Sequence, residues 1–328
     1  MMRMMKAGRQ LGLGLWVLLA AIGMLIPGGS LGADKIKIGV LLTSDTPIYV
    51  QTKDAAIREL AAAAFGQDRV VFDVKEAKVD SALAAKIAKQ FEADRVRLVI
   101  AMGTTATSGA FKELKDTPIV LSLVWDPVES GFAKSWTSSG TNVTGSSNRV
   151  PMVSVIKVLL RLAPVKRLGV MFNPSEKNSV LQMEEIRGLQ RESGFELVEV
   201  PINKKEEAAT VARTFAPRVN ALYATGAVTV TSQMEAIAAV AAENRLPTAS
   251  HISDTVEAGA LLGVIANLQE VGKLAGAKAA QVLRGAKPSD IPIETLKHFD
   301  VAINMKTANA SGIKIPVDLL QSATRVIR

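Results

Sequence analysis

Hydroxyl, amide, acidic and aromatic side chains occur at six short turns, each directly after an apolar run of the chain. The residues singled out are Ser44, Asp45 and Tyr49; Gly103, Thr104 and Thr105; Trp125 and Asp126; Asn173 and Glu176; Thr225 and Gly226; and His251 and Asp254. Hydroxyl and N–H groups at the start of a helix can hold a carboxylate, an indole can stack on a ring, and an acid can pair with an ammonium group. These residue types predict a binding site for a small polar or zwitterionic ligand.

Each of these turns also has a purely structural interpretation, which the sequence leaves open. Residues 103–105 open a predicted helix and can serve only as its cap, as can the polar residues of the later turns. Trp125 can be a core side chain, and Asp126 can cap the turn that Pro127 begins. His251, at the end of a predicted strand, is more often a hydrogen-bonded structural histidine than a ligand contact.

The composition argues against catalysis. The chain has no cysteine and two histidines, His251 and His298, which excludes thiolate zinc sites, iron–sulfur clusters, cysteine nucleophiles and histidine-rich metal sites. No Gly-x-Ser-x-Gly, Walker or dinucleotide glycine motif occurs. Asp45, Asp126 and Asp254 could converge as paired carboxylates, but their spacing does not require it. We therefore expect no catalytic residue, no metal and no cofactor.

The first 33 residues have the pattern of an export signal. Three basic residues precede an apolar run over residues 11–26, and Pro-Gly-Gly and small residues follow it. The run has 16 residues, shorter than the ~20 that a membrane-spanning helix needs. No cysteine at the boundary means no lipoprotein anchor. The pattern predicts a cleaved signal peptide over residues 1–33 and a periplasmic location.

The net charge of +8 is partly due to this segment and does not by itself indicate a nucleic-acid partner. Removing its three basic residues leaves 36 basic against 31 acidic residues, a net charge of +5 spread without basic clusters. Nucleic-acid-binding chains concentrate lysine and arginine on one face, with aromatic residues between them. We expect no nucleic-acid partner.

The elements that must position the polar turns alternate between strand and helix. The first half shows strands at 35–42, 70–74, 97–101 and 118–124, with helices at 52–64, 81–93 and 106–114. The second half shows strands at 167–172, 196–200, 221–224, 248–251 and 261–266, with helices at 179–192, 206–215 and 231–244. Such alternation predicts right-handed βαβ units and parallel sheets with helices on both faces.

Two lobes of one topology are favoured over one large sheet. The first strands of the halves echo each other, as "KIKIGVLLTSD" and "KRLGVMFNPSE". The stretch 138–148 between the halves is rich in turn formers and lacks apolar periodicity, which suits a crossover or hinge. Ligands of open α/β sheets sit beyond the carboxyl ends of the strands, so facing lobes would place all six turns around one cleft.

Two segments of the chain resemble the sequence pattern of a known protein family. Residues 125–132 ("WDPVESGF") and 140–147 ("GTNVTGSS") are similar to a "V-x-DPV-x-x-G … G-x-NVTG-S-S" pattern. That pattern is typical of periplasmic substrate-binding components of a bacterial ABC-transporter family labelled for tryptophan/tyrosine transport. Further similar stretches lie at 166–179, 259–261, 272–285, 288–294 and 312–316, so the resemblance covers nearly all of the chain after residue 33.

The resemblance implies a type I periplasmic-binding-protein fold, with two doubly wound lobes joined by three crossovers. Lobe 1 would comprise residues 34–145 plus about 267–294, and lobe 2 residues 146–266 plus about 295–328. The helix over 272–284 would then belong to the first lobe and the strand over 299–304 to the second. The resemblance also implies ligands that include aromatic amino acids, held in the cleft between the lobes. We expect a monomer that closes its lobes over a small polar or zwitterionic ligand, such as an amino acid, and then docks on an inner-membrane ABC permease.

The chain departs from the family pattern at two places that bear on the ligand, and both departures count against an aromatic amino acid. Many relatives carry His-Pro soon after the first strand, where this chain has Thr46-Pro47, and a frequent Asp-Tyr pair is replaced by Asn267-Leu268. An alternative function is a periplasmic sensing module that feeds a signalling receptor. Its fold and closure would be the same.

Overall fold

The computed structural model describes residues 35–65 and 69–328. The predicted signal peptide therefore lies outside the described residues. From Lys35 to Arg328 the chain forms one compact unit built around two sheets. Within the described part, no helix is both long and apolar enough to cross a membrane.

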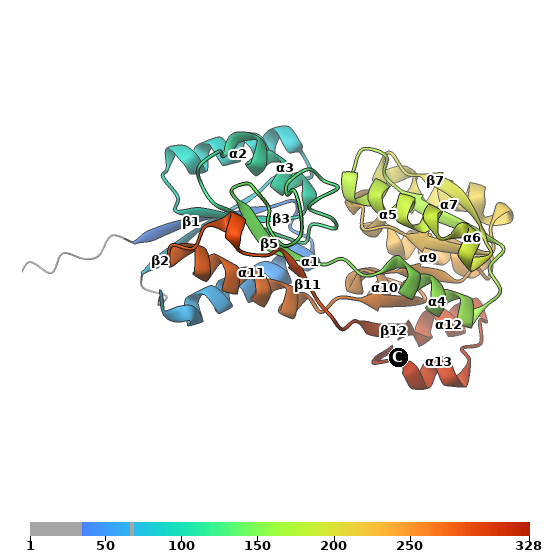
Figure 1. The fold of residues 1–328 in the computed structure, drawn as a ribbon. Coiled ribbons are helices and arrows are strands. Elements are labelled where there is room, and N and C mark those ends of the chain that lie inside the picture. Colours follow the sequence, from blue (N-terminus) through green and yellow to red (C-terminus); the bar gives the residue numbers. More distant parts are fainter. Residues whose placement is uncertain (1–34, 66–68) are drawn as a thin grey trace, which may run out of the picture. The chain divides into compact units, whose positions relative to one another are not determined.

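The first sheet has six parallel strands in the order β11-β5-β4-β3-β1-β2. The strands are β1 (Ile36–Leu42), β2 (Val70–Glu76), β3 (Leu98–Met102), β4 (Ile119–Ser122), β5 (Val143–Ser147) and β11 (Glu294–Thr295). The helices are α1 (Pro47–Leu60), extended by a π-helical turn (Ala61–Phe65), α2 (Ser81–Ala93), α3 (Thr104–Glu113), α11 (Leu268–Leu283) and a 3₁₀ turn (Pro288–Asp290). Helices α2 and α3 cover one face of this sheet and α1 and α11 the other (Figure 1).

Burial on both faces explains the continuous apolar runs of these strands. Ile38, Val40 and Leu42 of β1 join the core that α1 and α11 complete. The residue between them, Leu41, joins the opposite core with α2 and α3. Because successive side chains of a strand point to opposite faces, a strand covered on both sides must be apolar at every position.

The second sheet has seven strands in the order β13-β12-β10-β9-β8-β6-β7. They are β6 (Arg167–Phe172), β7 (Glu196–Pro201), β8 (Ala221–Ala224), β9 (Thr248–Ser250), β10 (Leu262–Ile265), β12 (Asp300–Asn304) and β13 (Arg325–Ile327). The helices are α4 (Met152–Leu162), α5 (Lys177–Gly188), α6 (Gln190–Ser193), α7 (Ala208–Phe215), α8 (Val228–Thr231), α9 (Met234–Glu243), α10 (Ser253–Glu257), α12 (Met305–Ser311) and α13 (Val317–Ser322), with 3₁₀ turns at Lys205–Glu207 and Ala216–Arg218. Helices α4 and α5 complete one apolar core of this lobe, and α7 and α9 complete the other.

The chain passes between the two sheets three times, after β5, after β10 and after β11. Between the second and third passages, α11 packs against α1 and β5 of the first sheet. The predicted α/β fold with two doubly wound lobes is confirmed. The residue boundaries given for the lobes stay a prediction.

Several predicted helix bounds were wrong; the helix predicted over 231–244, for example, begins at Met234 and follows the separate α8. Helix α1 begins at Pro47, five residues before the predicted start, because proline fits the first position of a helix and Thr46 before it is extended. The predicted helix over 179–192 begins two residues earlier and is two helices, α5 and α6, that meet at Leu189.

The stretch 138–148, predicted as a crossover or hinge, leads into the first passage between the sheets, but it also contains a central strand, β5. Its buried side chains are small hydroxyls instead of aliphatic groups. Thr144 donates to the carbonyl of Ile291, and Ser146 to the carbonyl of Val271. Because these hydroxyls find partners inside the lobe, the strand is fully buried without apolar periodicity.

Strand β12 departs from the expected parallel pairing, since it runs antiparallel to β10. The chain leaves the second sheet at the carboxyl end of β10, passes through α11 and β11 of the first lobe, and returns without a helix crossover. Because β12 enters the sheet beside the carboxyl end of β10, it must run in the direction opposite to β10.

Candidate functional site

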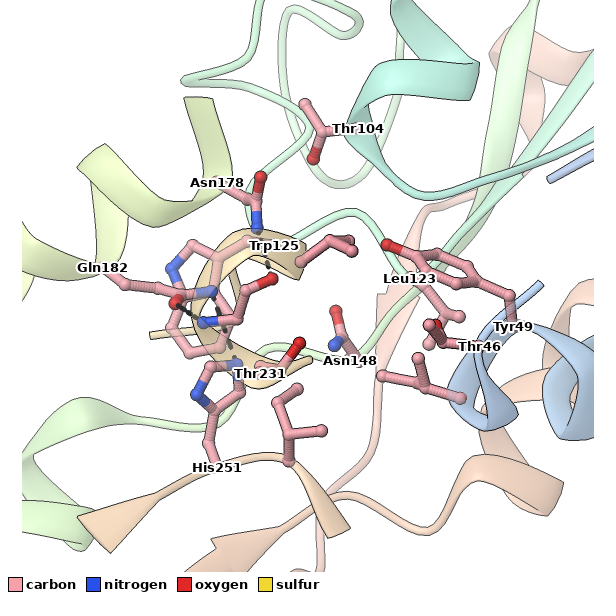
Figure 2. A pocket seen from close by; sticks show the side chains of 14 residues that line it. Thr46, Tyr49, Thr104, Leu123, Trp125, Asn148, Asn178, Gln182, Thr231 and His251 are labelled. Atoms are coloured by element: carbon pink, nitrogen blue, oxygen red, sulfur yellow. Dashed lines mark hydrogen bonds between the residues drawn. The ribbon is translucent and has the colours of Figure 1, made fainter. Parts of the chain in front are cut away.

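A pocket lies where the carboxyl ends of strands from both sheets meet the starts of helices (Figure 2). The side chains around it enclose about 460 Å³ of space when its opening to solvent is included. From the first lobe and the crossover it is lined by Thr46, Ile48, Tyr49, Thr104, Leu123, Trp125 and Asn148. From the second lobe it is lined by Asn178, Gln182, Gly226, Val228, Thr231, His251 and Ile252.

Trp125 and His251 bring the two lobes together at one side of the pocket. Their ring centroids are 4.8 Å apart with the planes at 64°, an edge-to-face contact. Trp125 follows β4 and is 2% exposed, and His251 follows β9 and is 3% exposed. A ligand on this side would meet a fixed aromatic wall.

A chain of hydrogen bonds fixes the orientation of His251. The backbone N–H of Gly226 donates to Oε1 of Gln182 at 2.7 Å, which turns the amide nitrogen of Gln182 toward Nε2 of His251 at 3.3 Å. Nε2 must then accept, so Nδ1 carries the proton and donates to the hydroxyl of Tyr223 at 2.6 Å. Burial lowers the pKa of His251 to about 3, and the ring is neutral at pH 7.

Tyr49 and Gly103 shape the opposite side. Tyr49 is buried, and both this burial and the nearby Glu176 carboxylate raise the pKa of its hydroxyl. Gly103, with φ +91°, lies so close that a Cβ there would stand 2.4 Å from Oγ1 of Thr43 and 2.8 Å from the Tyr49 ring. Only glycine permits this approach, which sets Thr104 at the start of α3 against the pocket.

Two polar atoms of the lining have no hydrogen-bond partner within the described residues. They are Oγ1 of Thr104 and Oδ1 of Asn148, on side chains that are 7% and 8% exposed. Buried polar atoms are nearly always paired in folded proteins. Two such atoms in one pocket therefore point to a bound ligand or solvent as their partner.

Five of the fourteen candidate residues predicted from the sequence line this pocket. They are Tyr49, Thr104, Trp125, Gly226 and His251. The other nine do not line it. They are Ser44, Asp45, Gly103, Thr105, Asp126, Asn173, Glu176, Thr225 and Asp254.

The buried acid Asp126 is occupied by protein partners. Its Oδ1 accepts the backbone N–H groups of Val128 at 2.9 Å and Glu129 at 3.0 Å. Its Oδ2 pairs with the guanidinium of Arg149, which also reaches Glu185 of α5 at 3.3 Å. Asp126 thus caps a turn and connects the first lobe, through Arg149, to the second.

Glu176 is occupied in the same way at the start of α8. Its carboxylate accepts the N–H of Val228 at 3.0 Å, the hydroxyl of Thr229 at 3.1 Å and the amide of Asn173 at 3.3 Å. Burial raises the pKa of Glu176, while these bonds oppose the rise. The hydroxyl of Thr225 is hydrogen-bonded to that of Ser179 at 2.7 Å. The polar side chains of these turns therefore bond to one another.

The remaining residues lie at the margins. Ser44 bonds to Thr46 at 3.0 Å, and Asp45 is exposed beside it. Gly103 and Thr105 flank Thr104 at the start of α3. Asp254 lines a neighbouring hollow, where its carboxylate accepts the backbone N–H of Ile48 from the other lobe; burial raises its pKa.

Sequence reasoning missed nine lining residues. They are Thr46, Ile48, Leu123, Asn148, Asn178, Gln182, Val228, Thr231 and Ile252. The Thr-Pro pair at the start of α1 was a helix-start signal that would have brought Ile48 to the pocket. Asn148 was missed because it follows β5, the strand that the sequence did not reveal.

The lining carries no side chain that is ionised at neutral pH. Its residues are apolar, aromatic, hydroxyl or carboxamide groups and the neutral His251. Among the residues that the structure describes, no cluster of three or more histidine, aspartate or glutamate side chains could hold a metal ion. The site is suited to binding a ligand of low net charge that has both a ring and hydrogen-bonding groups.

Comparison with known families identifies the architecture. The model of the family described as "ABC transporter substrate binding protein" matches residues 37–327. A curated relative named "Tyrosine-binding protein", from Clostridioides difficile strain R20291, is 29% identical over 275 residues, which cover 83% of this chain and 80% of that protein.

Solved structures show the same similarity. An ABC domain from Streptococcus pneumoniae in complex with L-Trp is 28% identical, with a TM-score of 0.85, covering 90% of this chain and all of that one. The ligand-free, open structure of a substrate-binding protein with adhesive properties from Clostridium difficile is 29% identical, with a TM-score of 0.70 over 89% of this chain and 99% of that one. At nearly equal identity, this structure is more similar to the liganded one.

Proposed function

Because the chain belongs to the ABC transporter substrate-binding protein family, we propose that it is the solute-binding component of an importer and that its pocket holds an amino acid. The observation that carries this proposal is the pocket itself, lined by both lobes and containing two buried polar atoms without partners. The relatives named for tyrosine and solved with L-Trp support an amino acid as the ligand.

The lining offers a separate place for each part of such a ligand. Trp125, Tyr49 and Leu123 provide an apolar and aromatic surface for a side chain. At the start of α3, the hydroxyl of Thr104 and the N–H groups of Thr104 and Thr105 can hold a carboxylate, which the positive end of the helix dipole favours. The next N–H, that of Ala106, already donates to Oγ1 of Thr43. An aromatic or large aliphatic side chain fits this arrangement best.

Closure of the two lobes is the proposed mechanism of capture. A ligand that contacts α3 in one lobe and α5 or α8 in the other makes all its contacts only when the lobes meet. It therefore binds the closed state more tightly and shifts the population toward it. The greater similarity to the L-Trp complex than to the open, ligand-free relative supports this mechanism. We further propose that the closed protein acts outside the cytoplasmic membrane and delivers its ligand to a permease.

Isothermal titration calorimetry with each L-amino acid tests the proposal. We expect one or a few to bind with one site per chain, and Trp125→Ala to weaken that binding by about tenfold or more through loss of the aromatic contact. Trp136→Ala is the matched control, because Trp136 is a tryptophan outside the pocket lining. No heat from any amino acid, or equal affinities for the two variants, would contradict the proposal.

A further inference from the structure

Asn148 is the residue of the pocket whose position is least explained by the fold. Its side chain is 8% exposed and makes no hydrogen bond to any described residue, and its Oδ1 is buried. Figure 2 shows its carboxamide among the side chains that line the pocket. A buried carboxamide without a partner destabilises the folded state, so folding alone does not explain an asparagine at this position.

The backbone around Asn148 is fixed on both sides. Before it, the hydroxyl of Ser147 donates to the carbonyl of Trp125 and accepts the N–H of Arg149, both at 2.9 Å. After it, the carbonyl of Arg149 accepts the hydroxyl of Thr295 at 3.0 Å, in β11, directly before the third passage between the sheets. The side chain is thus held in place before any ligand arrives, on the segment that joins the lobes.

None of the residues that line the pocket could offer a carboxylate to the amino group of a ligand. The lining itself contains no acid. Three acids that the sequence offered as contacts are bonded within the protein: Asp126 to Arg149, Glu176 to the start of α8, and Asp254 to the N–H of Ile48. Asp45, the fourth, is exposed and does not line the pocket. An ammonium group buried here needs neutral oxygen acceptors instead, and Oδ1 of Asn148 is a free acceptor.

We propose that Asn148 contacts the ligand directly and that its Oδ1 accepts a hydrogen bond from the ligand's amino group, where a side-chain carboxylate would otherwise be needed. This assignment rests on the proposed function and deepens it. Thr104, the other lining residue with a buried polar atom that has no partner, is then the place for the carboxylate. Asn148 therefore determines specificity for ligands that carry an amino group.

Two substitutions at position 148 distinguish a direct contact with the ligand from a purely structural role. Asn148→Leu removes the acceptor at similar volume, and we expect the affinity for the best-bound L-amino acid to fall by about tenfold or more. Asn148→Asp keeps an oxygen acceptor and adds a charge opposite the ammonium group, so its affinity should equal or exceed that of the wild type. Ser130→Ala is the matched control, because its hydroxyl is also buried without a partner but does not line the pocket.

The readouts are calorimetric affinity, the melting temperature without ligand, and affinity for the analogue of the same amino acid that lacks the amino group. We expect the wild type and Asn148→Leu to bind this analogue equally, and the melting temperature of Asn148→Leu not to fall. If the wild type binds the amino acid and Asn148→Leu binds it as tightly as Ser130→Ala does, the role of Asn148 is overturned and the proposed function stands. If the wild type binds no amino acid, the proposed function is overturned and the inference with it.

Discussion

At the scale of single residues, the pocket depends on groups that are neutral although they are titratable. His251 is the main example, because it lies between Gln182 and Tyr223 with its edge toward Trp125. Burial disfavours its protonated form, and no acid pairs with it among the bonds described. This neutrality makes the stability of the folded chain sensitive to pH.

The pH dependence has a definite sign. The pKa of His251 is about 3 in the folded chain and 6.5 for an unperturbed histidine, so between these values the unfolded chain binds the extra proton. The free energy of unfolding should therefore fall as pH falls from 6.5 toward 3, by up to about 1.4 kcal/mol per pH unit from this group. Urea unfolding at a series of pH values measures the slope.

The substitution His251→Gln should reduce that slope, since glutamine does not titrate. His298→Gln is the matched control, because His298 is the other histidine and is exposed. Equal slopes in the two variants and the wild type would show that the burial of His251 does not govern acid stability.

Sequence reasoning found the aromatic and histidine positions of the site better than its amides. Trp125 and His251 stood out because they follow apolar strands. Gln182 and Asn178 lie inside α5, where a polar residue usually means a solvated face, so nothing local marked them. The acids Asp126 and Glu176 were predicted as possible contacts, whereas the structure shows them occupied with capping and pairing inside the protein. Whether they also meet a ligand stays a prediction.

At the scale of elements, the close packing of α11 on α1 sets the position of one wall. Gly272 and Gly276 let the helices approach, because a Cβ on Gly276 would lie 2.5 Å from the carbonyl oxygen of Ala56. The start of α1 carries Ile48 and Tyr49 into the pocket. A side chain at the helix contact should therefore disturb both stability and binding.

We expect Gly276→Leu to lower the free energy of unfolding by about 2 kcal/mol or more, since overpacking forces backbone shifts. Gly188→Leu, in the last position of α5, is the matched control because a Cβ there meets nothing within 4 Å. Chemical denaturation of both variants measures the difference. A Gly276→Leu protein as stable as Gly188→Leu would mean that α1 and α11 can separate without cost.

Element boundaries were predictable where apolar periodicity or capping signals were strong. Helix α2 was predicted at its observed bounds, and Asp80 caps it through the N–H groups of Ala82 and Leu83. Strand β5 was not predictable from periodicity, since its buried positions are hydroxyls whose partners lie far away in the chain. Helix α4 was not predicted from the sequence, although six of its residues are buried.

At the scale of the whole molecule, the alternation of strands and helices was enough to predict two α/β lobes. Their interleaving was not, because a local pattern does not say to which sheet a later strand returns. The return of the chain to the first sheet through α11 and β11 was implied only by the family resemblance. The antiparallel β12 follows from that return and had no signal of its own.

The interleaving matters for function because three separate segments join the lobes. Asn148 and Arg149 lie on the first of these segments, and Thr295, the last residue of β11 before the third, bonds to the carbonyl of Arg149. Arg149 also pairs with Asp126 of one lobe and Glu185 of the other. A ligand bound at Asn148 thus contacts the hinge itself as well as the two lobes.

The most direct test of the account is a crystal structure of the chain grown with the L-amino acid that it binds best. We expect one molecule in the pocket between the sheets, its side chain against Trp125, its carboxylate at Thr104 and its amino group at Asn148. A pocket that stays empty at saturating concentration, or a ligand bound elsewhere on the chain, would contradict the central claim that this pocket is the solute site.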